Sequence, residues 1–131
     1  MDTNSTKRIS ERVIGCAYTV GNELGPGFLE RVYKKALCVE MIRNGLEVER
    51  QKQLNVTYKG EVVGKYFADI LVENYLLLEV KAVARLSPEH KAQVINYLKA
   101  TDLTVSLLIN FGTPRTEIKR IVWRHDDSKV I

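Results

Sequence analysis

The chain has 131 residues, 45% of them hydrophobic and 27% charged, which indicates one folded domain and excludes disordered, collagen-like and low-complexity classes. Lysine and arginine total 20 against 16 acidic residues, so the net charge of +4 mildly favours polyanionic partners without establishing one. Because no apolar run approaches the roughly 18 residues of a membrane span, and Cys16 and Cys38 lack zinc-ligand spacing, we expect a cytoplasmic protein with buried, reduced thiols.

Two helices are predicted first. Apolar residues recur at helical spacing from about Thr6 to Leu24, and the helix ends at Gly25-Pro26-Gly27. A second helix is expected from Phe28 to about Asn44, with Gly45 as the residue that follows its C-cap. The apolar stripe predicted for this second helix consists of Leu29, Val32, Ala36, Leu37 and Met41.

The pattern then changes from helical spacing to strand-like runs, with turn signals at Lys59-Gly60 and Glu73-Asn74. The runs are Leu54–Tyr58, Glu61–Tyr66, Phe67–Val72 and Tyr75–Lys81. Little polar alternation remains in the last two runs, which indicates a hairpin of buried strands.

A third helix and two further strands complete the predicted order. Ser87, Pro88 and Glu89 supply a cap, a first-position proline and a first-turn acid for a helix that runs to about Ala100. The nearly all-apolar run Thr104–Phe111 is typical of a strand covered on both faces, and the amphipathic run Ile118–Trp123 follows it. This order predicts an α/β domain with a mixed sheet and helices packed against it.

Charged residues interrupt the apolar strands at three positions. Asp69 stands in an apolar run, and Glu79 and Lys81 follow another. Residues two apart on a strand share a face, so Glu79 and Lys81 project side by side, and the hairpin can bring Asp69 alongside them. Burying such charges costs roughly several kcal/mol per ion unless they are paired or bind a metal.

Two interpretations of these charges remain open. Glu79 and Lys81 can be the solvent face of an amphipathic strand, with Asp69 a carboxylate near a turn. The functional interpretation is a Mg²⁺ site formed by Asp69, Glu79 and the backbone carbonyl of Val80, which are hard oxygen ligands. Lys81 would then position or help to deprotonate the attacking water and offset charge in the transition state of phosphodiester hydrolysis.

These residues carry a resemblance to a known family. Asp69 followed by Glu79-Val80-Lys81 resembles the D…(D/E)xK half of the PD-(D/E)XK nuclease superfamily. Residues 27–33, GFLERVY, read G-x-x-E-x-x-Y, and residues 92–98, AQVINYL, follow the predicted Glu-Val-Lys strand. Together these motifs resemble the GxxExxY family, a small single-domain branch of that superfamily. Many relatives have a basic residue before the motif aspartate, where this chain has Phe67.

The resemblance implies a restriction-endonuclease-like αβββαβ core with the site at one edge of the sheet. It also implies that Glu30 joins the acids and the lysine through water at the metal. Gln93 and Tyr97 match the family's helix motif and would line the same cleft, and their spacing independently places them on one helix face. Tyr33 and His90 are further candidates for substrate contact. Structural alternatives are a first-turn acid for Glu30, a surface amide for Gln93, core-edge tyrosines and a solvated histidine.

The leading hypothesis is a nuclease that uses Mg²⁺ or Mn²⁺ to hydrolyse phosphodiester bonds in DNA or RNA. Basic side chains expected to meet the phosphates are Lys34, Lys35, Arg85 and Lys91. The alternative is a non-catalytic module that binds nucleic acid or protein and keeps the nuclease fold. Further hypotheses are that the protein forms a homodimer or is a subunit of a larger defence or repair complex. No membrane partner is expected.

Overall fold

The computed structural model describes residues 3–124, with side chains from Lys7 onward. Its helices are α1 (Thr3–Leu24), α2 (Glu30–Arg43) and α3 (Pro88–Lys99), and its strands are β1 (Val48–Tyr58), β2 (Glu61–Val72), β3 (Leu76–Lys81), β4 (Val105–Asn110) and β5 (Glu117–Val122). The strands form one sheet in the order β1-β2-β3-β4-β5. Neighbouring strands are antiparallel except β3 and β4, which are parallel and are connected through α3.

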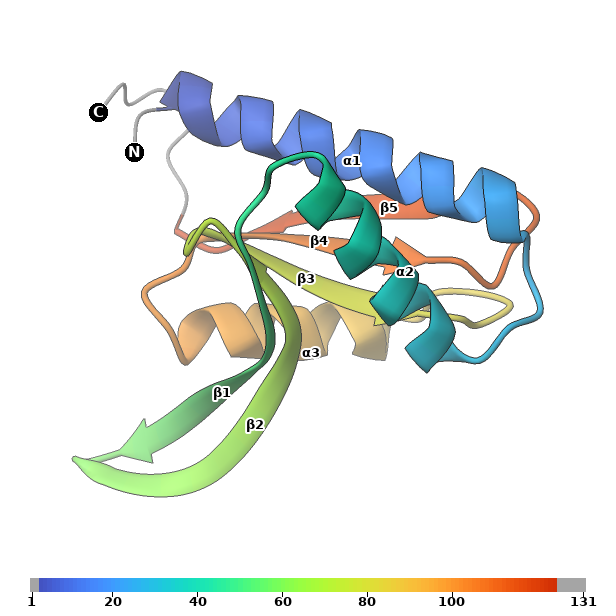
Figure 1. Cartoon of the computed structure of the whole chain (residues 1–131). Helices are drawn as coiled ribbons and strands as arrows, with labels where there is room; N and C mark the ends of the chain where they lie inside the picture. The colour runs from blue at the N-terminus through green and yellow to red at the C-terminus, as the bar shows by residue number, and fades with distance from the viewer. Residues whose placement is uncertain (1–2, 125–131) are drawn as a thin grey trace.

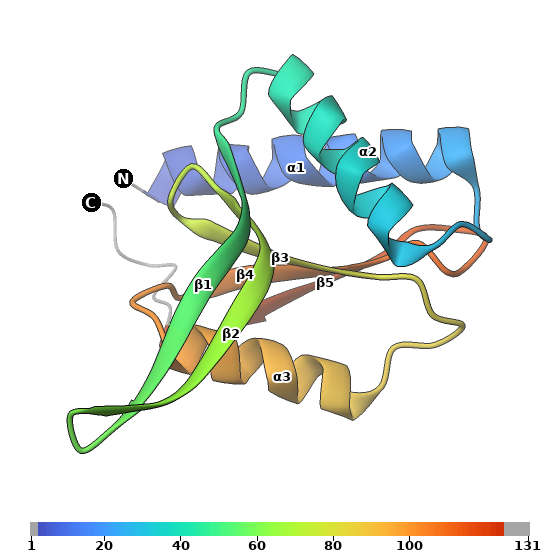
Figure 2. The ribbon, with the colours of Figure 1, turned by 60° about the horizontal axis from the view of Figure 1, so that its bottom comes forward.

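The helices cover the sheet on both faces. Helices α1 and α2 lie on one face and α3 lies on the other, as both views show (Figures 1 and 2). Three sequential strands follow α2, and α3 then leads to the parallel strand β4. The predicted α/β class, the mixed sheet and the restriction-endonuclease-like αβββαβ order are therefore confirmed.

The core has two parts, one on each face of the sheet. On one face, residues of α1 and α2 such as Val13 and Leu37 pack against β2, β3 and β4. On the other face, Val94 and Leu98 of α3 pack against Leu77 and other sheet residues. All six residues of β4 are buried, as predicted for a strand that is covered on both sides. Each fully buried aliphatic side chain stabilises the fold by roughly 1.5–3 kcal/mol relative to exposure.

Tight turns join the first three strands where the sequence predicts them. Lys59 and Gly60 have φ angles of 50° and 82°, and Glu73 and Asn74 have 53° and 56°. Two consecutive positive φ angles are typical of the turns whose twist matches that of a hairpin. The two runs predicted between these turns are one continuous strand, β2.

The hairpin of β1 and β2 is much longer than its contact with β3. Strand β2 pairs with β3 only from Ile70 to Val72, whereas the pairing of β1 with β2 continues to Tyr58 and Glu61. We call the part beyond the edge of β3, residues 53–67, the arm. Figure 1 shows the arm leaving the sheet and curving past α3. The divergence of β2 from β3 opens the sheet at the charged residues.

The helix boundaries differ from prediction by a few residues. Helix α1 begins at Thr3 and α2 begins at Glu30. The N-cap of α2 is Leu29, which is 63% exposed. Gly45 follows the end of α2 and has a φ angle of 79°. The buried stripe of α2 contains Tyr33 and Cys38, whereas Leu29 is not part of it. Cys16 and Cys38 are free and buried, and burial raises the pKa of both thiols. None of the described helices is both long enough and apolar enough to cross a membrane.

Candidate active site

Two carboxylates lie at the point where β2 and β3 separate. The last backbone pair between these strands is Ile70 with Leu78, so the next position brings Asp69 opposite Glu79. The backbone N–H of Asp69 donates to Glu79 Oε1 (3.0 Å), and the backbone N–H of Val80 donates to Asp69 Oδ2 (2.7 Å). The carboxylates thus accept bonds from backbone donors that the separated strands no longer satisfy, and both are buried, at 7% and 3% exposure.

The burial of this pair changes its electrostatics. Desolvation, followed by the negative charge of Asp69, raises the pKa of Glu79 to about 8, although Lys81 and the backbone of Asp69 act in the other direction. Two close carboxylates in a dry site do not both ionise at low cost. A carboxyl with a pKa near 8 is mostly protonated at neutral pH, so without a metal Glu79 carries little charge.

Lys34 supplies a cation that the sequence did not predict at this position. Its Nζ lies 2.8 Å from Asp69 Oδ1 and 3.2 Å from Glu30 Oε1, so one ammonium joins α2 to β2. Burial would lower the pKa of Lys34, but hydrogen bonds and charges of Asp69 and Glu30 raise it above its ordinary value. Lys34 was predicted to meet the phosphates, and in this structure its ammonium is paired with Asp69 and Glu30. The available signal was its position four residues after Glu30, which places both on one helix face.

Lys81 approaches the same place from the end of β3. Its Nζ lies 3.5 Å from Oε1 of Gln93 on α3, a long hydrogen bond across the opening between the strand and the helix. Lys81 is half-buried, and Gln93 is exposed. The structure thus brings Glu30, Asp69, Glu79, Lys81 and Gln93 together in one region, as the motifs predict, with Lys34 among them.

The oxygen atoms of this region suit a hard divalent cation. Asp69 Oδ1 already contacts the positive charge of Lys34, which shows that a cation is stabilised there. Mg²⁺ is commonly held by one or two carboxylates together with waters, so Asp69 and Glu79 suffice in number and chemistry. Across residues 7–124, however, no three His, Cys, Asp or Glu side chains are grouped closely enough to hold a metal ion. Glu30 reaches the acid pair through the ammonium of Lys34, and its predicted place at the metal through water stays a prediction.

Two predicted substrate contacts have structural roles. Tyr33 is fully buried, and its hydroxyl donates to the carbonyl of Gly25 and accepts from the N–H of Phe28 (3.1 Å). The prediction that Tyr33 contacts substrate is wrong, because its ring and hydroxyl hold the loop before α2. His90 forms a capping box with Ser87, in which His90 Nδ1 accepts from the Ser87 N–H at 3.0 Å. One ring nitrogen of His90 is therefore committed to the start of α3, and its proposed phosphate contact is limited to the other nitrogen.

The remaining predicted contacts differ in how exposed they are. Tyr97 is 8% exposed, and burial, followed by the charges of Glu79 and Asp69, raises the pKa of its phenol. Exposed basic side chains lie on the loop after β3, on α3 and on α2. They are Arg85, Lys91 and Lys35.

Asn110, which the sequence analysis did not single out, fixes the chain just after Lys81. Its buried amide accepts from the N–H groups of Val83 and Gly112 (3.0 Å each) and donates to the carbonyl of Val83 (2.9 Å). A Cβ atom at Gly112 would lie 2.3 Å from the backbone N and O of Val83, so only glycine allows this approach. The end of β4 thereby holds the loop that follows the catalytic lysine candidate.

An acid pair and a lysine on diverging strands of a mixed sheet, with helices on both faces, define a restriction-endonuclease-like nuclease core. Residues 7–121 match the sequence profile of the PD-(D/E)XK nuclease superfamily, and the chain belongs to this superfamily. Its structure is similar to that of an alkaline exonuclease from Laribacter hongkongensis, with a TM-score of 0.53 and 18% sequence identity. The similarity covers 75% of this chain and 57% of that chain, so this chain spans little more than half of the exonuclease. No curated protein matches the sequence.

Proposed function

We propose that this protein is a metal-dependent nuclease of the GxxExxY branch that hydrolyses phosphodiester bonds in DNA or RNA. The observation that carries the proposal is the position of Asp69, Glu79 and Lys81 at the split between β2 and β3, with Gln93 facing them from α3. Superfamily membership supports the reaction class. The net charge of +4 suits a polyanionic substrate in the cytoplasm.

The proposed roles follow from the atoms that each side chain presents. Asp69, Glu79 and the carbonyl of Val80 would hold Mg²⁺ or Mn²⁺, which supplies Lewis-acid stabilisation of the phosphate and lowers the pKa of water. Lys81 would position or help to deprotonate the attacking water and offset charge in the transition state, and its contact with Gln93 restricts its ammonium. Lys34 balances the acids when no other cation is present, and a cation at Asp69 Oδ1 competes with this ammonium.

The test is a cleavage panel over single-stranded, duplex and branched DNA and RNA with Mg²⁺, Mn²⁺ or EDTA. We expect cleavage that requires metal and falls by at least about 100-fold in Lys81→Ala, since positioned proton-transfer groups contribute factors of this size. Lys7→Ala is the matched control, because Lys7 is an exposed lysine near the start of α1, the helix on the sheet face opposite α3 (Figure 1). Equal turnover of Lys81→Ala and wild type would show that the triad is assigned wrongly.

A protein that binds nucleic acid without metal-dependent cleavage would instead be the non-catalytic module that we considered as the alternative. Size measurement with and without oligonucleotide in the same experiment tests the proposed homodimer.

A further inference from the structure

A groove adjoins the candidate active site on the α3 side of the sheet. It lies between the arm and α3 and has a volume of about 710 Å³. Residues from both walls line it: Asn55, Val56, Thr57 and Tyr66 from the arm, and Glu89, Ala92, Gln93, Asn96, Tyr97, Lys99 and Ala100 from α3 and its end. Gln93 also contacts Lys81, so the groove opens directly at the candidate catalytic lysine.

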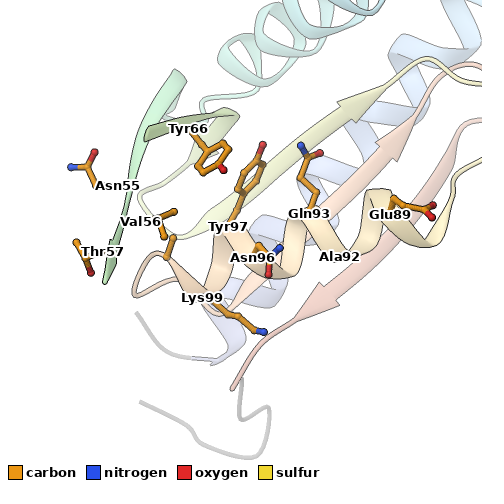
Figure 3. Close-up of a pocket in the computed structure, with 11 residues that line it drawn as sticks. Asn55, Val56, Thr57, Tyr66, Glu89, Ala92, Gln93, Asn96, Tyr97 and Lys99 are labelled. Atoms are coloured by element: carbon orange, nitrogen blue, oxygen red, sulfur yellow. The ribbon is translucent and has the colours of Figure 1, made fainter. Parts of the chain in front are cut away.

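Two tyrosines form the centre of this groove. Figure 3 shows Tyr66 reaching from β2 toward Tyr97, which stands beside Gln93 on α3. The two tyrosine rings have centroids 5.9 Å apart and planes at 48°, so each supports the other in a tilted contact. Tyr97 is 8% exposed, whereas Tyr66 is 49% exposed. Tyr97 is therefore the buried partner of the pair, and about half of the Tyr66 surface is accessible to a ligand.

The other lining side chains favour a ligand with both ring faces and polar edges. Asn55, Thr57, Gln93 and Asn96 supply amide and hydroxyl groups that both donate and accept hydrogen bonds. Unpaired bases present this combination, because stacking on aromatic rings and hydrogen bonds to exposed base edges are how proteins recognise single strands.

The charges of the groove indicate where the phosphates of such a strand would lie. Among the lining residues, Glu89 is the one acid and Lys99 the one base. The ammonium of Lys99 lies 4.6 Å from the ring centre of Trp123, and the guanidinium of Arg124 lies 5.5 Å from it. Lys99 is the last residue of α3, and both cations contact Trp123, so they lie at the end of α3 that is far from Glu89.

We propose that the groove between the arm and α3 binds an unpaired segment of the nucleic-acid strand, with one base stacked on Tyr66 and the phosphate backbone directed toward Lys99 and Arg124. The position of phosphodiester cleavage, where Gln93 contacts Lys81, rests on the proposed nuclease function. The size of the groove agrees, since sites of about 300–1,000 Å³ enclose small organic molecules. The substrate is accordingly single-stranded at the site, as a free strand, a flap or a frayed end.

The test measures binding of the full chain to fluorescently labelled single-stranded DNA, single-stranded RNA and duplex DNA of equal length, in EDTA so that no cutting occurs. We expect tighter binding to a single strand than to duplex, and a loss of about tenfold or more in Tyr66→Ala, from the usual contribution of one stacked base. Tyr66→Phe keeps the ring and should bind nearly as wild type does. Phe67→Ala is the matched control, because Phe67 is the next residue of β2, is 55% exposed and points to the opposite face.

A 2-aminopurine base in the oligonucleotide gives a second readout that does not depend on affinity. Stacking on Tyr66 should quench its fluorescence at saturation in wild type and not in Tyr66→Ala. Equal losses for Tyr66→Ala and Phe67→Ala, equal affinity for duplex, or no binding to any oligonucleotide would each overturn the inference.

The same proteins with Mg²⁺ separate this inference from the proposed function. Tyr66-dependent binding without any cleavage would retain the groove and reject the nuclease. Metal-dependent cleavage that Tyr66→Ala leaves unchanged would retain the nuclease and reject the groove.

Discussion

The buried carboxyl of Glu79 predicts an unusual dependence of stability on pH in the metal-free protein. Its pKa is about 8 in the folded chain and about 4.5 in the unfolded chain. Between these two values the folded state binds a proton that the unfolded state does not bind, so the stability falls as the pH rises. The limiting slope for one such group is about 1.4 kcal/mol per pH unit. Below about pH 4.5 and above about pH 8, this contribution is constant.

The full difference amounts to about 5 kcal/mol, an upper limit because relaxation and water entry reduce the cost of ionising a buried group. Glu79→Gln should remove the slope. The variant keeps an oxygen that accepts the bond from the Asp69 N–H, but it has no proton to lose. At pH 8 and above we therefore expect Glu79→Gln to be more stable than wild type, with the two proteins converging toward pH 5.

Urea unfolding in EDTA from pH 5 to 9 measures this difference. A wild-type stability that is flat or rises between pH 5 and 8, or an equal slope in Glu79→Gln, would refute the raised pKa of Glu79.

Three further predictions follow from the same geometry. Asp69→Asn should reduce the loss of stability between pH 5 and 8, because the charge of Asp69 raises the pKa of Glu79. The same variant should lose the stabilisation of about 1–3 kcal/mol that excess Mg²⁺ or Mn²⁺ gives wild type. Thermal melts with EDTA and with metal check both outcomes. That gain in wild type should increase from pH 6 to pH 8, because a liganding Glu79 must first lose its proton; an unchanged or falling gain would argue against Glu79 as a ligand. Gly112→Ala should cost roughly 1–3 kcal/mol in urea unfolding through its clash with Val83, whereas Gly15→Ala, which meets no atom within 4 Å inside α1, should be neutral or stabilising.

The fold and the acid pair were accessible from the sequence because they depend on local patterns. Alternation and turn residues identified the strands, and two hairpin turns with positive φ angles formed where the sequence placed them. Asp69 and Glu79 each interrupt an apolar run, and the two runs are joined by the short β2–β3 hairpin. The register of that hairpin then brings the two residues opposite each other. The short loop of residues 73–75 between β2 and β3 leaves few alternative pairings.

Contacts that depend on the packing of distant elements were not accessible. The ion pair of Lys34 with Asp69 requires the position of α2 on the sheet, and a lysine in a helix otherwise predicts a solvated surface. The approach of Tyr66 to Tyr97 requires the curvature of the arm, which pairing patterns do not specify. Tyr33 was misassigned because a motif tyrosine predicts a ligand contact as readily as a buried hydroxyl that holds two backbone groups.

The opening of the sheet accounts for both the structural and the chemical features of the site. Two strands that separate inside a protein leave backbone donors without partners, at a cost of about 1–3 kcal/mol for each buried donor. Asp69 and Glu79 accept bonds from two such donors, so the acids stabilise the split that gives a substrate access to them. Burying the charge of the two carboxylates still costs free energy. Protonation of Glu79 and the ammonium of Lys34 reduce this cost. A divalent cation at the pair would replace both, and this exchange links metal binding to pH and to the position of α2.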